Sequence, residues 1–246
     1  MRYFAARVAL WTILCASLLY SGAALAQAPA GAVPQTQKLP ALYSASETLR
    51  LKILWPSGAS MGEATLTATP GQGELRMEVA MQAVLPFQKI SGTFTSVATG
   101  EGLCSRQYHR KVMEGPKSSE ETIEFDQTAH TARRTLGGQT ATSPIVPCAH
   151  DPLAFIYFVR AQMAAGRTVD ASSFFLGPER SLLLARNGPE SVTVAGSPRS
   201  ADKFALTLGA PNRTRSFDVW ISSTARREPL LVRLPLPLAV FSAELE

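Results

Sequence analysis

The chain is 246 residues long, with 24 lysines and arginines against 19 aspartates and glutamates and a formal net charge of +5. A length of this order suits a single all-β domain and is sufficient for a substantial buried core. The positive charge is small and is spread along the chain. The composition therefore does not favour a nucleic-acid-binding protein, which would carry a more basic and more clustered surface.

The first 26 residues have the pattern of a cleavable export signal. Arg2 and Arg7 give a basic start, residues 8–19 form an apolar stretch, and Ala24-Leu25-Ala26 places small residues at a cleavage point. The apolar stretch is short for a retained membrane anchor. We therefore expect residues 1–26 to be a signal peptide, a mature periplasmic chain that begins at Gln27, and no membrane-spanning segment after cleavage.

Residues 27–42 are predicted to form a flexible leader. The stretch QAPAGAVPQTQKLP at residues 27–40 carries three prolines and shows no hydrophobic periodicity. A segment of this kind cannot bury enough apolar surface to order itself. The folded part is therefore expected to be one β domain over residues 43–246.

From Ser46 onward, apolar residues alternate with a period of two, which predicts strands. In the first strand, Leu49, Leu51, Ile53 and Trp55 fall on one face, and mostly polar residues fall on the other. Further strands are expected near residues 64–68, 75–81, 90–98, 103–113, 119–125 and 131–136, with turn-forming sequences between them. Their connections are too short for parallel crossovers, so the neighbours should pair antiparallel.

One segment, at about residues 151–165, has helical spacing instead. Asp151 can cap a helix, and Pro152 suits the first helical position because no amide donor is needed there. Apolar residues then occur on every side of the segment, including Leu153, Phe155, Ile156, Tyr157, Phe158 and Val159. A helix of this composition is expected to be surrounded by protein, so we place it in the hollow of a curved sheet.

After the helix, strands are expected near residues 168–176, 180–186, 190–196, 203–209, 215–223 and 230–245. The predicted fold is mainly β, with a single strongly curved antiparallel sheet or open barrel of about 11–12 strands and one helix in its concave side. Trp220 lies on the face of its strand that should be solvated. It is expected either to pack against a loop or to line a ligand surface.

Two cysteines, Cys104 and Cys148, remain after signal removal, and an oxidising compartment favours a disulfide between them. By the loop-entropy relation such a bond restrains the unfolded chain by about 4 kcal/mol. A metal site formed with His109 and His150 is the alternative, but the spacings are unusual for zinc, and Cys104 and His109 fall on opposite strand faces. No metal and no other cofactor is therefore assigned.

Catalytic chemistry has weak support in the sequence. A Cys148 nucleophile with His150 as its base would need a third group to orient the imidazole, and Asp151 is expected to cap the helix instead. No nucleophile elbow or phosphate-binding glycine loop is present in the sequence. No catalytic residue is assigned.

Several segments occur in an order that is typical of one protein family: SETLRLKILW, MGEATL, IEFD, DPLAFIYFVR, FDVWIS and RREPLLVRL. The strongest motif is Asp151-Pro152-Leu153 with Tyr157 and Arg160, supported by Trp220 and by Arg226-Arg227 with Pro229. In these features the chain resembles the DUF3108 family of Gram-negative envelope proteins, over about residues 43–245. The resemblance implies a periplasmic β domain and supplies no catalytic residues. The stretch LPLPLAVF departs from the family pattern, which tends to place a glycine before the last strand.

The sequence thus predicts a non-enzymatic periplasmic envelope protein that binds a hydrophobic small molecule, such as a lipid or acyl chain, or an envelope protein partner. The residues expected to line a ligand surface are Met77, Met81, Phe155, Phe158 and Trp220. The same residues are equally consistent with a filled core. An envelope hydrolase and a Cys/His metal-binding protein are the alternative functions.

Overall fold

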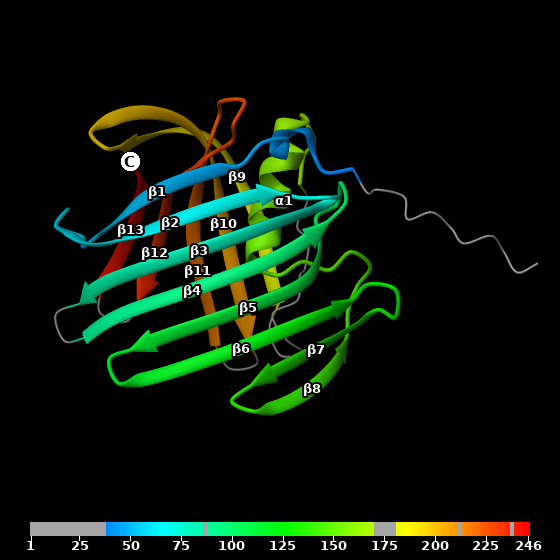
Figure 1. Cartoon of the computed structure of the whole chain (residues 1–246). Helices are drawn as coiled ribbons and strands as arrows, with labels where there is room; N and C mark the ends of the chain where they lie inside the picture. The colour runs from blue at the N-terminus through cyan, green and yellow to red at the C-terminus, as the bar shows by residue number, and fades with distance from the viewer. Residues whose placement is uncertain (1–37, 86–87, 170–180, 211–212, 237–238) are drawn as a thin grey trace, which may run out of the picture. The chain divides into compact units, whose positions relative to one another are not determined.

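The structure is a computed structural model that describes residues 38–85, 88–169, 181–210, 213–236 and 239–246. These residues form thirteen strands, one short 3-10 helix and one α-helix (Figure 1). The strands are β1 (Glu47–Leu54), β2 (Ser60–Pro70), β3 (Glu74–Leu85), β4 (Gln88–Thr99), β5 (Cys104–Glu114), β6 (Lys117–Asp126), β7 (Thr131–Leu136), β8 (Gln139–Pro144), β9 (Ser181–Val194), β10 (Ser197–Ala210), β11 (Arg213–Ser222), β12 (Pro229–Leu236) and β13 (Ala239–Leu245). The 3-10 helix η1 (Ala41–Tyr43) precedes β1, and α1 (Pro152–Ala164) lies between β8 and β9 in the chain.

All thirteen strands belong to one antiparallel sheet, in the order β8-β7-β6-β5-β4-β3-β2-β1-β13-β12-β11-β10-β9. The first and last strands pair at its middle, where Leu51 lies opposite Ala64 of β2 and Leu245 of β13. The sheet therefore has an N-terminal arm, β1–β8, and a C-terminal arm, β9–β13. It is not closed into a barrel, because β8 and β9 are its two edges. The predicted fold class is confirmed.

The strand boundaries differ from the prediction in three places. The expected strand at 230–245 is a hairpin, β12–β13, in which Leu236 pairs with Ala239. The strands expected at 180–186 and 190–196 correspond to one long strand, β9 (Ser181–Val194), which a short turn joins to β10. The polar strand β8 was not predicted, and most of the strand expected at 168–176 lies outside the described residues.

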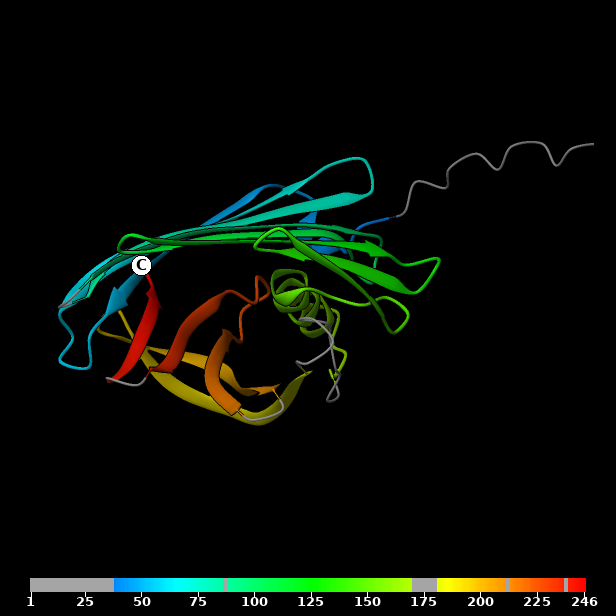
Figure 2. The same cartoon turned by 90° about the horizontal axis from the view of Figure 1, so that it is seen from below.

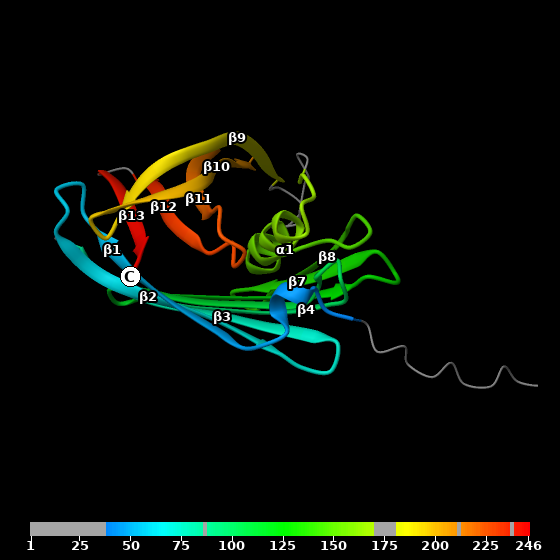
Figure 3. The ribbon, with the colours of Figure 1, turned by 90° about the horizontal axis from the view of Figure 1, so that it is seen from above.

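The helix α1 lies between the two arms of the sheet (Figures 2 and 3). On one side Ala154 and Tyr157 pack with Leu75 and Met77 of the N-terminal arm. On another side Phe155, Val159 and Met163 pack with Leu184, Phe204, Leu206, Val219 and Ile221 of the C-terminal arm. The helix is thus enclosed by apolar contacts, which explains why its sequence has no polar stripe. Within the described residues, no helix has the length and apolar character needed to cross a membrane.

A third apolar cluster joins β9–β11 to the middle of the sheet. Val192, Val194 and Ala201 pack there with Leu49, Leu51 and Leu245. Trp220 belongs to this cluster and is only 2% exposed. Its indole nitrogen donates to Glu190, and Lys203 and Arg233 lie over its ring at 4.8 and 4.9 Å from the ring centre. Trp220 therefore covers the sheet by packing, held by charged side chains around its ring.

Candidate functional site

A cavity of about 260 Å³ lies between the start of α1 and the middle of the sheet. Leu153 and Ile156 of α1 form its helical side. Its sheet side consists of Leu51, Ile53, Ala64, Leu66, Val79, Met81, Ala83, Leu85, Ile90, Val219, Pro229, Val232, Leu234, Phe241, Ser242 and Ala243. The surface that these residues expose to the cavity is entirely apolar. Only a hydrocarbon group could enter it without losing hydrogen bonds to water.

Strand alternation explains how the sequence forms this lining. Val79, Met81 and Ala83 are two residues apart in β3, so their side chains lie on the same face of the sheet. The wall also contains the small side chains of Ala64 and Ala243 from neighbouring strands. Because alanines occupy positions where longer side chains would reach towards α1, space remains beneath the helix.

The cavity opens at one end of the sheet. Leu234 lines it and is 39% exposed, so this residue lies at the mouth. At the same end β1, β3 and β12 finish and β2, β4 and β13 begin, as the pairing of Leu54 with both Ser60 and Ser242 shows. We call this the open end of the sheet; the turn between β1 and β2 lies at the left in Figure 1.

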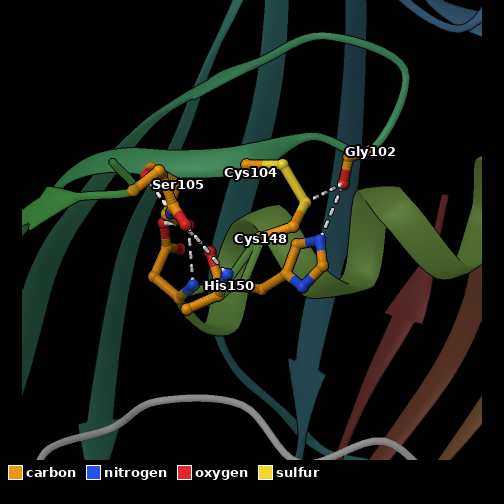
Figure 4. Close-up of a disulfide and its surroundings, with 8 residues drawn as sticks. Gly102, Cys104, Ser105, Cys148 and His150 are labelled. Carbon is orange, nitrogen blue, oxygen red and sulfur yellow. Dashed lines mark hydrogen bonds between the residues drawn. A yellow bond between two sulfur atoms is a disulfide. The ribbon is translucent and has the colours of Figure 1, made fainter. Parts of the chain in front are cut away.

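The opposite end of the sheet holds the start of α1 by a covalent bond. Cys104 at the beginning of β5 forms a disulfide with Cys148, three residues before the N-cap, and the two Cα atoms are 4.6 Å apart (Figure 4). The predicted disulfide is therefore present. His150 Nε2 lies 2.7 Å from the Gly102 carbonyl oxygen, and burial lowers the pKa of His150 although this bond opposes the shift. At Gly102 a Cβ would lie 2.8 Å from Cys148 Sγ, so the close approach requires glycine.

Asp151 is the N-cap of α1 and is completely buried. Its Oδ1 accepts hydrogen bonds from the Leu153 and Ala154 amides at 2.9 and 3.1 Å. Its Oδ2 accepts from the Ser96 and Ser105 hydroxyls at 2.6 and 2.7 Å. Burial raises the pKa of Asp151, and the hydroxyl and amide bonds partly oppose that shift. The carboxyl group thus joins the helix to β4 and β5 and has no free oxygen for chemistry.

Arg160 holds the second half of α1; the sequence identifies it only as part of the family motif and assigns no role to it. Its side chain is fully buried, and its two terminal nitrogens donate to the Glu47 carboxylate, both at 2.8 Å. Its Nε donates to the Arg227 carbonyl at 2.7 Å, and the Tyr157 ring lies 4.9 Å from the guanidinium carbon. Burial opposes the charged form, but the Glu47 bonds prevail and the pKa of Arg160 is raised. We call Cys104, Cys148, Asp151, Arg160 and Glu47 the anchored end.

The predicted ligand-lining residues separate into two groups. Met81 lines the cavity. Met77, Phe155, Phe158 and Trp220 do not line this cavity and belong to or pack against the three core clusters, as in the filled-core alternative that the sequence left open. The reason is the position of α1, which covers β3 at Met77 and leaves it uncovered at Met81, four residues further along.

The alternative metal set does not form. The sulfurs of Cys104 and Cys148 are bonded to each other, and His109 lies on the surface with its Nε2 3.0 Å from Glu120. The Nε2 atom of His150 contacts the Gly102 carbonyl oxygen and not a side chain that could share a metal ion with it. Among the described residues, no group of three His, Cys, Asp or Glu side chains is arranged to hold a metal ion.

A family model described as "Protein of unknown function (DUF3108)" matches residues 48–246, which is nearly the whole folded region. The chain belongs to the DUF3108 family. The family resemblance seen in its helix start and strand motifs is confirmed. No curated protein matches this DUF3108 chain.

Among solved structures, this DUF3108 chain is similar to a protein from Brucella abortus whose structure is titled "Crystal Structure of Beta-barrel-like Protein of Domain of Unknown Function DUF1849". The two share 8% sequence identity with a TM-score of 0.56, and the match covers 82% of this chain and 96% of the Brucella chain. At this identity the likeness concerns the fold alone.

Proposed function

We propose that this DUF3108 protein is a non-enzymatic periplasmic protein that binds an acyl chain in the cavity under α1. The observation that carries the proposal is an apolar cavity of about 260 Å³ that opens to solvent at Leu234. An apolar cavity of about 150 Å³ already binds benzene in an engineered protein, and each buried CH₂ group contributes about 0.8 kcal/mol. A ligand's polar headgroup would remain outside the mouth.

The chemistry of the lining supports binding without catalysis. Ser242 is the one lining residue with a polar side chain, and no acid or base lies in the wall. The buried charged groups of the helix, Asp151 and Arg160, have their hydrogen bonds to serines, amides, carbonyls and Glu47. A general acid or base for hydrolysis would need a proton-transfer path to the cavity, and these groups are already committed to structural bonds.

The disulfide supports export to an oxidising compartment, because such bonds seldom persist in the cytosol. The proposed location in the periplasm would also give the protein access to membrane lipids. The anchored end suits a binding role as well, since it holds the helix wall of the cavity in one position while cargo enters and leaves.

The test is native mass spectrometry of the protein purified from the periplasm, followed by titration of the delipidated protein with a fluorescent fatty acid. We expect a retained apolar mass and saturable binding. In the Ala83→Leu variant, which fills the cavity, binding should weaken at least about tenfold. Ala80→Leu is the matched control, because Ala80 is on the same strand but exposed. Equal fatty-acid binding by both variants, or none by the parent protein, would overturn the proposal.

A further inference from the structure

We infer that the open end of the sheet docks on the surface of a lipid bilayer, where it would exchange the acyl cargo. The choice of cargo rests on the proposed function, but the docking surface rests on separate observations. They are the distribution of exposed apolar side chains and the position of Trp55.

Exposed large apolar side chains concentrate at the open end. Among the described residues five such side chains are at least 39% exposed: Val84 (57%), Met113 (47%), Val146 (50%), Leu234 (39%) and Val240 (51%). Four of them, all except Val146, lie near strand ends at the open end: Val84 pairs with Lys89, Met113 with Ser91, and Leu234 with Phe241. Gathered apolar exposure of this kind marks an interaction surface.

Three of these side chains, Leu234, Val240 and Val84, lie beside the cavity mouth on both faces of the sheet. Leu234 is on the cavity side, and its cross-strand partner Phe241 also lines the cavity. Val240 and Val84 are each adjacent in sequence to a lining residue, Phe241 and Leu85, so strand alternation turns them to the other face. A bilayer can receive both faces of these strand ends at once, and an acyl chain could then leave the mouth without crossing water.

One further side chain, Trp55, favours a lipid surface over a protein partner. Trp55 follows β1 at the open end, and its ring packs edge-on against Phe241 with the ring centres 4.9 Å apart. Tryptophan is enriched where membranes meet water. Lys89, which is exposed and directly opposite Val84, lies beside the apolar surface together with Lys52, Glu63 and Glu246. Because charges of both signs border the surface, we expect no preference for anionic headgroups.

The experiment is flotation of the delipidated protein with vesicles of phosphatidylethanolamine and phosphatidylglycerol, compared with vesicles of phosphatidylcholine alone. We expect flotation with both kinds of vesicle to a similar extent, because apolar side chains and not net charge carry the docking. The double variant Val84→Ser/Val240→Ser should float at least about tenfold more weakly. Because both positions are exposed, this variant should fold normally. Val146→Ser, equally exposed at the other end of the sheet, should float as the parent does.

The Ala83→Leu variant separates this inference from the proposed function. It should lose fatty-acid binding and keep flotation, whereas Val84→Ser/Val240→Ser should keep fatty-acid binding in solution and lose flotation. The docking inference is overturned if the parent protein fails to float with either vesicle, or if Val84→Ser/Val240→Ser floats as well as Val146→Ser. Flotation without fatty-acid binding would instead overturn the proposed cargo and leave the docking surface in place.

Discussion

The anchored end and the open end of this sheet bury opposite kinds of side chain. At the anchored end, a buried aspartate and a buried arginine have their hydrogen bonds satisfied by serines, backbone groups and Glu47, beside a disulfide. At the open end, the wall is apolar and the space under the helix is not filled. Buried polar groups with complete bonding impose one geometry, whereas apolar walls accept ligands of varied shape. The comparison indicates that the anchored end holds α1 in one position, and that the cavity at the open end accepts hydrocarbon groups of varied shape.

The largest expected effect is loss of the buried ion pair at the anchored end. Arg160→Met leaves the Glu47 carboxylate, which is 12% exposed, without its two hydrogen bonds from Arg160 and with only the longer ion pair to Arg226 at 3.8 Å. The free energy of unfolding should fall by about 3–5 kcal/mol. Urea denaturation measures this change. The matched control is Arg133→Met, because Arg133 also pairs with a glutamate, Glu124, but on the surface, where about 0–1 kcal/mol is expected. Similar losses in the two variants would contradict the structural role given to Arg160.

Removal of the disulfide should have the next largest effect. The two cysteines are 44 residues apart, so Cys104→Ser/Cys148→Ser removes a covalent restraint on that loop in the unfolded chain. We expect a loss of about 2–4 kcal/mol in the free energy of unfolding. Urea denaturation of the double variant, and of the parent with and without reductant, provides the measurement. The reduced parent should match the variant. If reduction leaves the parent's denaturation midpoint unchanged, the bond does not stabilise the anchored end.

Leucine substitutions at two alanines compare the packing of the two ends directly. Ala98 is completely buried in the cluster beneath α1, so Ala98→Leu should overpack it and cost about 1–3 kcal/mol. Ala83 faces the cavity, so Ala83→Leu should fill empty space and stabilise the protein by about 0.5–1 kcal/mol. Thermal or urea denaturation gives both values. A loss at Ala83 equal to that at Ala98 would show that the space under the helix is already filled.

The sequence predicted the helix and its start because those signals are local. Asp151 followed by Pro152 specifies an N-cap and a first helical residue regardless of what surrounds them. The period of two likewise identified most strands. It missed β8, in which only Ser143 is buried, because that strand is held by pairing with β7 and has no apolar alternation.

The site was less predictable because it depends on contacts between distant segments. Arg160 and Glu47 are 113 residues apart, and nothing in either neighbourhood indicates the pair. Met77 and Met81 have the same residue type and the same strand face, yet one is core and the other lines the cavity. The point at which α1 crosses β3 decides which methionine is buried under the helix, and the bonds of the anchored end determine that point.

The smallest predicted effect is a dependence of stability on pH through His150. Burial lowers the pKa of His150 below its ordinary 6.5, so between that value and its lower folded value the unfolded chain binds more protons than the native protein. Stability should therefore fall as pH falls through this window, by about 1 kcal/mol or less between pH 7.5 and 5.5. Urea denaturation at both pH values measures the change. His150→Gln should reduce the difference, because glutamine retains a donor for the Gly102 carbonyl and has no titrating ring. An undiminished pH dependence in His150→Gln would mean that other groups at the anchored end cause it.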